Sequence, residues 1–183
     1  MAPPDLALLR PTRDLIAQVL EWRNHPDVTR WLMRTEVDPE RFSRAWLESV
    51  SDPRQAGVVA VVGGRAVATG TLEVRDGSGQ DGHEAAYTAS EGLLGYLVDP
   101  AYAGRGIATV VARAMLDAGF GELGVRRVTA GCFADNVGSW RVMEKLRMRR
   151  EQHGVADSFH GELGWVDGYT YAILAEEWRG GGR

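Results

Sequence analysis

Cysteine and lysine are almost absent from this sequence, and each scarcity excludes a class of protein. Cys132 is the only cysteine, so an internal disulfide is impossible and a cysteine-rich zinc site is excluded. The four histidines show no metal-ligand spacing, and we therefore expect no bound metal. Lys145 is the only lysine, and the formal net charge is −4. Proteins that bind nucleic acid usually present a basic face, so this balance predicts no nucleic-acid partner and favours an amine-bearing one.

Long apolar runs are also missing. No run approaches the ~20 residues that span a bilayer, and Met1–Asp5 lack the basic segment and apolar core of a secretory signal. We expect a cytoplasmic protein with no membrane partner. A length of 183 residues suits one domain, to which we assign residues 1–179, and we expect a disordered glycine-rich tail over 180–183. Composition leaves open whether the chain forms a homodimer.

The most informative stretch runs from Glu91 to Leu123. Its apolar segment, residues 93–98, fits a buried strand that Pro100 ends. A glycine-rich segment follows. Beyond it, apolar residues recur at helical spacing, at Ile107, Val110, Val111, Ala114, Met115 and Ala118. The pattern predicts a strand, a loop and a helix, with Gly104 and Gly106 at the helix N-terminus.

That loop has the properties of an anion site. The first turn of a helix carries unpaired N–H groups and a partial positive charge, glycine lets the backbone approach a phosphate, and Arg105 adds charge. An ordinary glycine-rich turn is the alternative interpretation. The nucleotide loop Gly-x-x-x-x-Gly-Lys-Ser/Thr does not occur, and the glycines around Arg105 lack the third glycine of the dinucleotide fingerprint.

The rest of the chain alternates strands and helices, which predicts one mixed α/β domain. Further strands are expected over 6–10, 58–62, 65–75, 126–133, 148–155 and 166–174, and further helices begin near residues 11–14, 38–40 and 135–136. Strand 126–133 should lie parallel to strand 93–98, because a helix connects them. The polar segment 76–90 is predicted as a loop. The aromatic stretch 22–32 indicates either helix packing or the wall of a substrate cleft.

Taken together, these motifs resemble the GNAT acyltransferase superfamily, and within it the Rim-type group, which includes acetyltransferases of ribosomal-protein N-termini. The resemblance covers nearly the whole chain. The matching segments are Leu8–Pro11 and Trp22–Asn24 at the start, Val98–Thr109 for the acetyl-CoA motif, Asn136–Ser139 with Glu144–Leu146 for the next motif, and Trp165–Ala172 for the last strand. The resemblance implies a mixed central sheet flanked by helices, with its fourth and fifth strands parallel and splayed.

The resemblance also implies acetyl-CoA as cofactor. Its pantetheine arm would pair with the backbone of Leu97 and Val98. Its pyrophosphate would be held by the backbone N–H groups of Ala103, Gly104, Arg105, Gly106, Ile107, Ala108 and Thr109. Asn136 and Ser139 would complete the site. Ala103 stands where the family motif carries Gln or Arg, which removes a side-chain contact and leaves the backbone contacts in place.

Acetyl transfer to an amine requires a base, an oxyanion donor and a proton for the departing thiolate. The backbone N–H of Leu97 or Val98 is the expected oxyanion donor. The tyrosine that many GNAT enzymes use as the acid is replaced by Met143, so the Rim-type resemblance points to Ser139; the alternative is a helix-start serine that satisfies backbone groups. Candidates for the base are three side chains, each with a solvated surface role as its alternative: Glu91, His160 and Glu162.

Three hypotheses about function follow. The first is an acetyl-CoA-dependent N-acetyltransferase that transfers the acetyl group directly to a protein N-terminal amine. The second keeps the chemistry and replaces the acceptor with a small amine such as an antibiotic, a polyamine or an amino-sugar. The third is a non-catalytic acyl-CoA-binding module. Cys132 is interpreted as a buried structural thiol, with an acyl-carrying nucleophile as the alternative.

Overall fold

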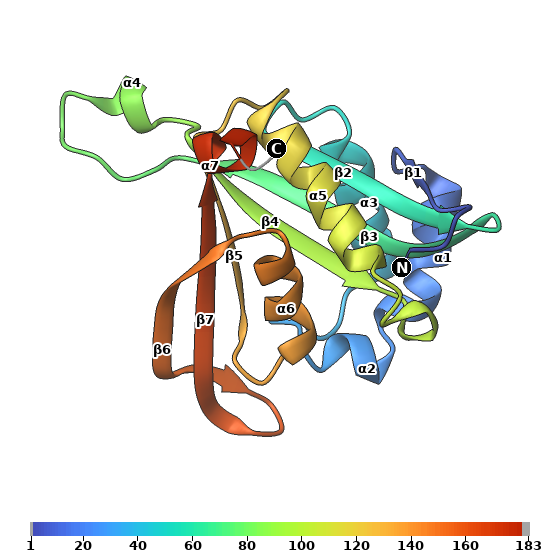
Figure 1. The fold of residues 1–183 in the computed structure, drawn as a ribbon. Coiled ribbons are helices and arrows are strands. Elements are labelled where there is room, and N and C mark those ends of the chain that lie inside the picture. Colours follow the sequence, from blue (N-terminus) through green and yellow to red (C-terminus); the bar gives the residue numbers. More distant parts are fainter. Residues whose placement is uncertain (1, 181–183) are drawn as a thin grey trace.

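A seven-stranded mixed sheet runs through the molecule in the order β1-β2-β3-β4-β5-β7-β6 (Figure 1). The computed structural model describes residues 2–180. The strands are β1 (Ala7–Leu9), β2 (Gln55–Val62), β3 (Arg65–Arg75), β4 (Glu91–Val98), β5 (Arg127–Phe133), β6 (Arg149–His160) and β7 (Gly164–Leu174). All neighbouring strands are antiparallel except β4 and β5, which are parallel as predicted. The predicted α/β fold is confirmed.

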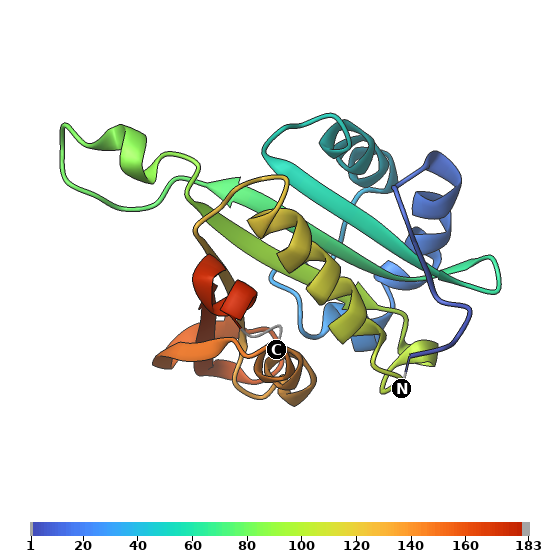
Figure 2. The ribbon, with the colours of Figure 1, turned by 45° about the horizontal axis from the view of Figure 1, so that its top comes forward.

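Helices cover both faces of the sheet. They are α1 (Arg13–Arg23), α2 (Pro26–Thr29), α3 (Pro39–Ser49), α4 (Glu84–Tyr87), α5 (Ile107–Phe120), α6 (Val137–Lys145) and α7 (Ala175–Gly180), with a 3-10 turn η1 (Pro100–Tyr102). Figure 2 shows α5 and α6 on one face and α1 and α3 on the other. Local signals begin several helices: Thr12 caps α1, and Asp38 caps α3 with Pro39 at its first position.

The buried stripe of α5 differs slightly from the predicted one. Its fully buried residues include Ala112, Leu116 and Gly119, whereas Val110, Ala114 and Ala118 are only half-buried. The stripe keeps the predicted Ile107, Val111 and Met115 and extends to the residues that follow Val111 and Met115, where α5 packs on both β3 and β4. Four buried residues of α5 join residues of β5, β7 and α6 in the largest core cluster: Ala112, Met115, Leu116 and Phe120.

Helix α6 ends without the glycine that usually follows a helix. Arg147 adopts the left-handed conformation there, with φ of 61°. Its N–H donates to the carbonyl of Glu144 (2.9 Å), and the N–H of Met148 donates to the carbonyl of Met143 (3.0 Å). These two bonds form a Schellman motif, which compensates for the strain of a non-glycine residue at this position.

Several boundaries differ from the predicted ones. Strand β6 extends to His160, past the expected end near residue 155, and its register with β7 shifts at two places. The predicted loop 76–90 contains the single-turn helix α4 and projects from the body of the molecule (Figure 1). Gly180, expected in the tail, is the last residue of α7, and residues 181–183 lie outside the described residues. Within 2–180, no helix has the length and apolarity to cross a membrane.

The sheet opens between its two parallel strands. β4 pairs with β5 only through Glu91, Gly92 and Leu93, although β4 continues to Val98. Beyond Leu93 the two strands diverge, and in Figure 1 they spread apart toward their carboxyl ends. The splayed strands predicted from the resemblance are present, and they leave one edge of β4 without a neighbouring strand.

Candidate functional site

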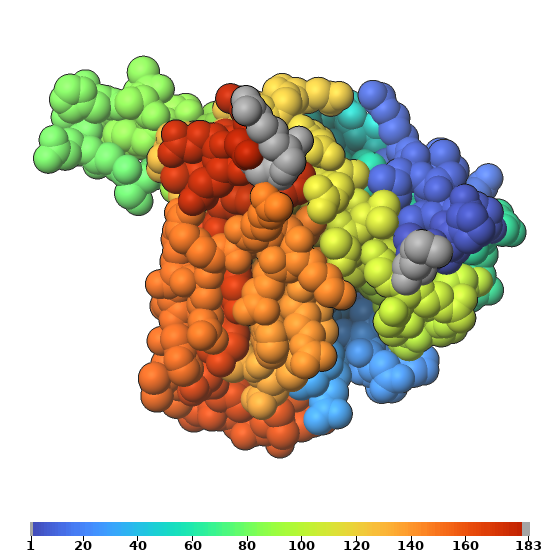
Figure 3. Space-filling view, in the orientation of Figure 1, coloured from blue at the N-terminus to red at the C-terminus, as the bar shows by residue number. Residues whose placement is uncertain are grey.

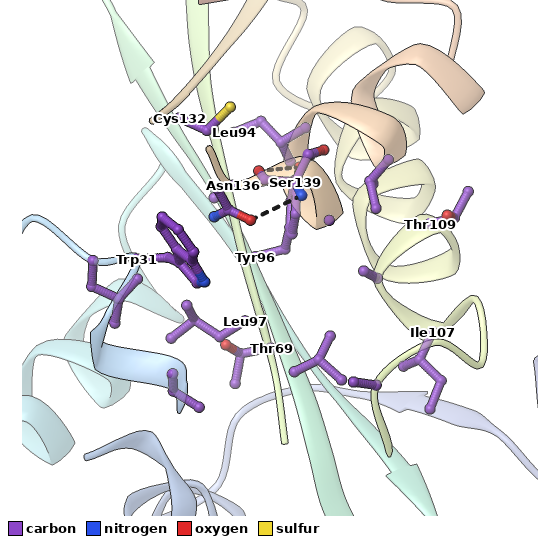
Figure 4. Close-up of a pocket in the computed structure, with 18 of the residues that line it drawn as sticks. Trp31, Thr69, Leu94, Tyr96, Leu97, Ile107, Thr109, Cys132, Asn136 and Ser139 are labelled. Carbon is purple, nitrogen blue, oxygen red and sulfur yellow. Dashed lines mark hydrogen bonds between the residues drawn. The ribbon is translucent and has the colours of Figure 1, made fainter. Parts of the chain in front are cut away.

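A cavity of about 730 Å³ lies at this opening. Its walls come from the loop before α5 and the start of that helix, from the second half of β4, from α6, and from the segments around α2 and α3. In Figure 3 the surface is hollowed between the orange α6 segment and the yellow-green segment that leads into α5. In Figure 4, Trp31, Leu97 and Thr69 lie on one side of the cavity, and Ile107 and Thr109 lie on the other.

The glycine-rich loop has the backbone conformation of an anion site. Gly104 and Gly106 have φ of 74° and 78°, a region that side chains disfavour, and no side chain caps α5. The amide of Ala103 donates to Pro100, and that of Thr109 donates to Gly106, so both expected phosphate donors at the ends of the segment are already used. The donors that remain for an anion are the amides of residues 104–108.

Arg105 does not point into the cavity. Its guanidinium lies over the ring of Tyr102, 4.9 Å from the ring centre, and donates to the carbonyl of Ala101 at 3.2 Å. Two cations of α6 line the cavity in its place, Arg141 and Lys145. Sequence reasoning missed them, although their spacing of four residues from each other on one helix face was available.

The register of β4 decides which of its amides face the opening. The N–H of Asp99 donates to the carbonyl of Val67 on β3 (2.8 Å). In an antiparallel ladder every second residue bonds to the same neighbour, so the backbone N–H and C=O groups of Leu97 also face β3, opposite Thr69. The intervening residues, Tyr96 and Val98, direct their N–H and C=O groups toward the opening. Of the two amides proposed from sequence, that of Val98 therefore faces the cavity, and that of Leu97 faces β3.

Ser139 and Asn136 stand at the start of α6, across the opening from β4. Asn136 is the N-cap, and its Oδ1 accepts from the N–H of Ser139 at 3.2 Å. This leaves the Ser139 hydroxyl free of the capping role. The hydroxyl instead lies 2.9 Å from the Oη of Tyr96. Tyr96 Oη donates its one hydrogen to the Ser139 carbonyl at 2.9 Å, so in that arrangement Ser139 Oγ is the donor to Oη. Tyr96 is a site residue that sequence reasoning missed, since its partner lies 43 positions away.

Two weak acids share this environment. Burial raises the pKa of the Tyr96 hydroxyl well above its ordinary value, and the hydrogen bond with Ser139 offsets only part of that rise. Cys132 of β5 also lines the cavity, half-buried and beside Ser139. Burial raises the pKa of its thiol, again partly offset by Ser139. Both groups therefore remain protonated near neutral pH, and Cys132 lacks the thiolate of a nucleophile.

The three candidate bases lie outside the cavity lining. Glu91 pairs with Arg127 at 3.0 Å, at the joint between β4 and β5. Glu162 is exposed and pairs with Arg30 at 3.5 Å.

His160 is only 4% exposed, and it packs against the rings of Trp31 and Phe133. Its Nδ1 accepts from the amides of Glu162 and Leu163, so Nε2 donates to the Arg30 carbonyl at 2.8 Å. The structure thus gives all three candidates structural contacts and brings none of them to the cavity.

Comparison with known proteins identifies the fold and the family. The profile of the acetyltransferase (GNAT) domain matches residues 5–149. YnaD of Bacillus subtilis, named an uncharacterized N-acetyltransferase, is 41% identical over 85 residues, which cover 46% of this chain and 49% of YnaD. The chain thus spans about half the length of the curated relatives it matches.

Solved structures share the fold over almost the full length. A GNAT acetyltransferase from Bacillus anthracis has a TM-score of 0.73 and 26% identity, with 97% of this chain and 98% of that chain covered. The yncA protein of Salmonella typhimurium, solved with its cofactor acetyl-CoA, has a TM-score of 0.76 at 18% identity, with 93% and 94% covered. With the profile covering most of its length, the chain belongs to the GNAT acetyltransferase family.

Proposed function

We propose that this protein is an acetyl-CoA-dependent N-acetyltransferase that transfers the acetyl group directly to a primary amine. The observation that carries this function is the single cavity at the split of the sheet. It joins a glycine-rich helix N-terminus, the open edge of β4 and lining residues from the segments around α2 and α3. A cofactor and an acceptor can therefore meet between β4 and β5 without crossing the core.

The residues present fit acetyl-CoA. The amides of residues 104–108 and the N-terminus of α5 suit a pyrophosphate, and Arg141 and Lys145 add two positive charges on the facing helix. The peptide-like pantetheine arm suits the backbone groups of Tyr96 and Val98 on the open edge of β4. When bound, acetyl-CoA supplies the activated acetyl thioester.

The chain's own groups then have separate tasks. The amide of Val98 would donate to the thioester oxygen, where negative charge develops. The hydroxyl of Ser139 would donate a proton to the departing sulfur and regain one from water at the open mouth, and Tyr96 holds that hydroxyl in place from 2.9 Å. Because Glu91, His160 and Glu162 stand outside the cavity lining, we assign the proton lost by the amine to water at the open mouth.

A protein N-terminal amine is the acceptor we propose first, supported by the resemblance of Trp22–Asn24 and Trp165–Ala172 to the Rim-type group. A small-molecule amine is the second candidate, because a volume of about 730 Å³ is also typical of small-ligand sites. We place the protein in the cytoplasm, an assignment supported by the sequence alone.

Two measurements test the function. Acetyl-CoA at a hundredfold excess over its Kd should stabilise the fold by about 2.7 kcal/mol and raise Tm by about 5–10 °C. Free-thiol release should then depend on an added amine. Binding without amine-dependent turnover, across peptides and small amines, would identify a non-catalytic acyl-CoA-binding module. Desulfo-CoA is the matched control, since it should raise Tm and release no thiol.

A further inference from the structure

Part of the cavity lies on the face of the sheet opposite α5 and α6, and we call this part the second chamber. Alternation along the strands directs Leu97 of β4 and Thr69 and Thr71 of β3 toward this face, away from the glycine-rich loop. Leu97 packs against the core cluster beneath α1, which places the chamber on the α1–α3 side. An acceptor that meets a thioester at Val98 must lie here, because the opposite face is used by the cofactor-binding groups.

The wall of this chamber is mainly apolar. Trp31 and Leu32 follow α2, while Phe42 and Trp46 come from one face of α3, with their rings 6.2 Å apart. All four side chains are half-buried, so each still presents surface to a ligand. Met33, 83% exposed, extends the same wall toward solvent.

Trp31 is held in position by its neighbours. The ring of His160 packs 5.5 Å from it, and the guanidinium of Arg30 lies 5.2 Å from the centre of its ring. Arg30 therefore already occupies the site over Trp31 that an ammonium group of a ligand would seek, and it repels a second cation there. Trp31 offers its remaining surface as a rigid apolar contact.

Carboxylates are sparse in the lining of the cavity. Among the described residues that line the whole cavity, Asp27 is the only carboxylate, and its side chain is 74% exposed. A ligand with several ammonium groups requires a carboxylate for each, because a cation placed against an apolar wall loses hydration without compensation. One carboxylate beside an apolar wall suits one ammonium group on an apolar body.

We infer that the acceptor is a monoamine whose primary amino group is joined to a large apolar or aromatic group, and that polyamines are excluded. This assignment rests on the proposed function and names its substrate class. The same chemistry has two sources, a free small amine or a peptide N-terminus whose first side chain is large and apolar.

Matched acceptors test this assignment in a thiol-release assay with acetyl-CoA. Pentylamine and putrescine have the same chain length and differ only at the far end, which is a methyl group or an ammonium group. We expect kcat/KM for pentylamine to exceed that for putrescine by about tenfold or more, and 2-phenylethylamine to react faster still. Peptides beginning with Phe or Asp form the second arm, with the Phe peptide expected to react faster by a similar factor.

A variant of the exposed wall checks the location. Met33→Glu places a second carboxylate in the chamber, and it should lower the pentylamine-to-putrescine ratio by about threefold or more. Met33→Leu keeps the wall apolar and should preserve the ratio. The side chain of Met33 is exposed, so neither variant removes core packing.

The outcomes separate the two levels of the inference. Turnover that favours putrescine over pentylamine, or the Asp peptide over the Phe peptide, overturns the acceptor class and leaves the acetyltransferase function standing. Faster turnover of pentylamine than of putrescine supports the acceptor class with a free amine as its source. Faster turnover of the Phe peptide than of the Asp peptide supports it with a peptide N-terminus as its source. Absence of turnover with every amine, with acetyl-CoA bound, overturns the proposed function together with the acceptor class. An unchanged ratio in Met33→Glu refutes the placement of the acceptor in this chamber.

Discussion

Removal of the Tyr96 hydroxyl tests how the leaving thiolate receives its proton. Tyr96 Oη has one hydrogen and two neighbours on Ser139, the carbonyl and Oγ, each 2.9 Å away. In the resting structure that hydrogen goes to the carbonyl, so Oγ donates to Oη; when Tyr96 turns its hydrogen to Oγ, the hydroxyl hydrogen of Ser139 is free to point into the opening of the sheet. Tyr96→Phe removes this arrangement and retains the ring, so Tyr96 is expected to act as a positioning residue for Ser139.

The size of the effect follows from the two hydrogen bonds. Each contributes about 0.5–1.5 kcal/mol net, so the variant should lose about 2 kcal/mol of stability and about 4–8 °C of Tm. Loss of one orienting bond in the transition state corresponds to about 1.4 kcal/mol, or about a tenfold drop in kcat. Ser139→Ala removes the proposed acid itself and should lower kcat about a hundredfold.

The assay is kcat and KM by thiol release, with Tyr171→Phe as the matched control. The Tyr171 hydroxyl donates to Glu144 at 3.2 Å and lies outside the cavity lining, so that variant should lose stability and keep kcat. KM for acetyl-CoA should change less than about threefold in Tyr96→Phe, because the ring still packs. The double variant Tyr96→Phe/Ser139→Ala should be no slower than Ser139→Ala alone. A kcat in Tyr96→Phe within twofold of the parent would refute the role.

Three further variants and one pH dependence are expected to behave as follows. Glu91→Gln breaks the pair with Arg127, so stability should fall by about 1 kcal/mol with kcat unchanged; a hundredfold loss of kcat would instead restore Glu91 as the base. Gly104→Ala places a Cβ on a residue with φ of 74°, and no atom of the described residues beyond its chain neighbours lies within 4 Å of that Cβ, so backbone strain is the only cost. Unfolding titrations should show a free energy of unfolding lower by about 1 kcal/mol, and an unchanged value would contradict that backbone conformation. The parent should show no acetylated Cys132 by mass spectrometry and Cys132→Ala should turn over within threefold of the parent, because burial raises the pKa of the thiol; an acetylated Cys132 would contradict this. Burial raises the pKa of Tyr96 above its ordinary 10.0, so the folded state holds this proton more tightly than the unfolded chain does. The free energy of unfolding should therefore fall as pH rises above 10, and less steeply in Tyr96→Phe. Equal slopes in the parent and the variant would contradict the raised pKa.

The order strand, glycine loop, helix followed from local chemistry and was predictable from the sequence. Pro100 ends β4, glycines supply positive φ at the start of α5, and Asn136 caps α6. These signals act through the backbone within a few residues, so their consequences do not depend on the rest of the fold. The parallel pairing of β4 and β5 was predictable for a related reason, since a helix connects them.

Contacts between distant segments decided the rest. The guanidinium of Arg105 lies over the ring of Tyr102, and pairing with β3 turns the amide of Leu97 away from the opening. Neither orientation can be read from the glycine-loop sequence. His160 meets the carbonyl of Arg30, 130 positions earlier, and that contact uses its free nitrogen.

The same holds for the apolar wall of the cavity and for the contact between Tyr96 and Ser139. Trp31 and Phe42 become one wall only when α2 and α3 pack beneath the sheet, and Tyr96 reaches Ser139 only across the split between β4 and β5. The sequence by itself therefore determined where a cofactor loop lies. Tertiary structure decided which groups face it, because burial and hydrogen-bond partners arise only when separate segments pack together.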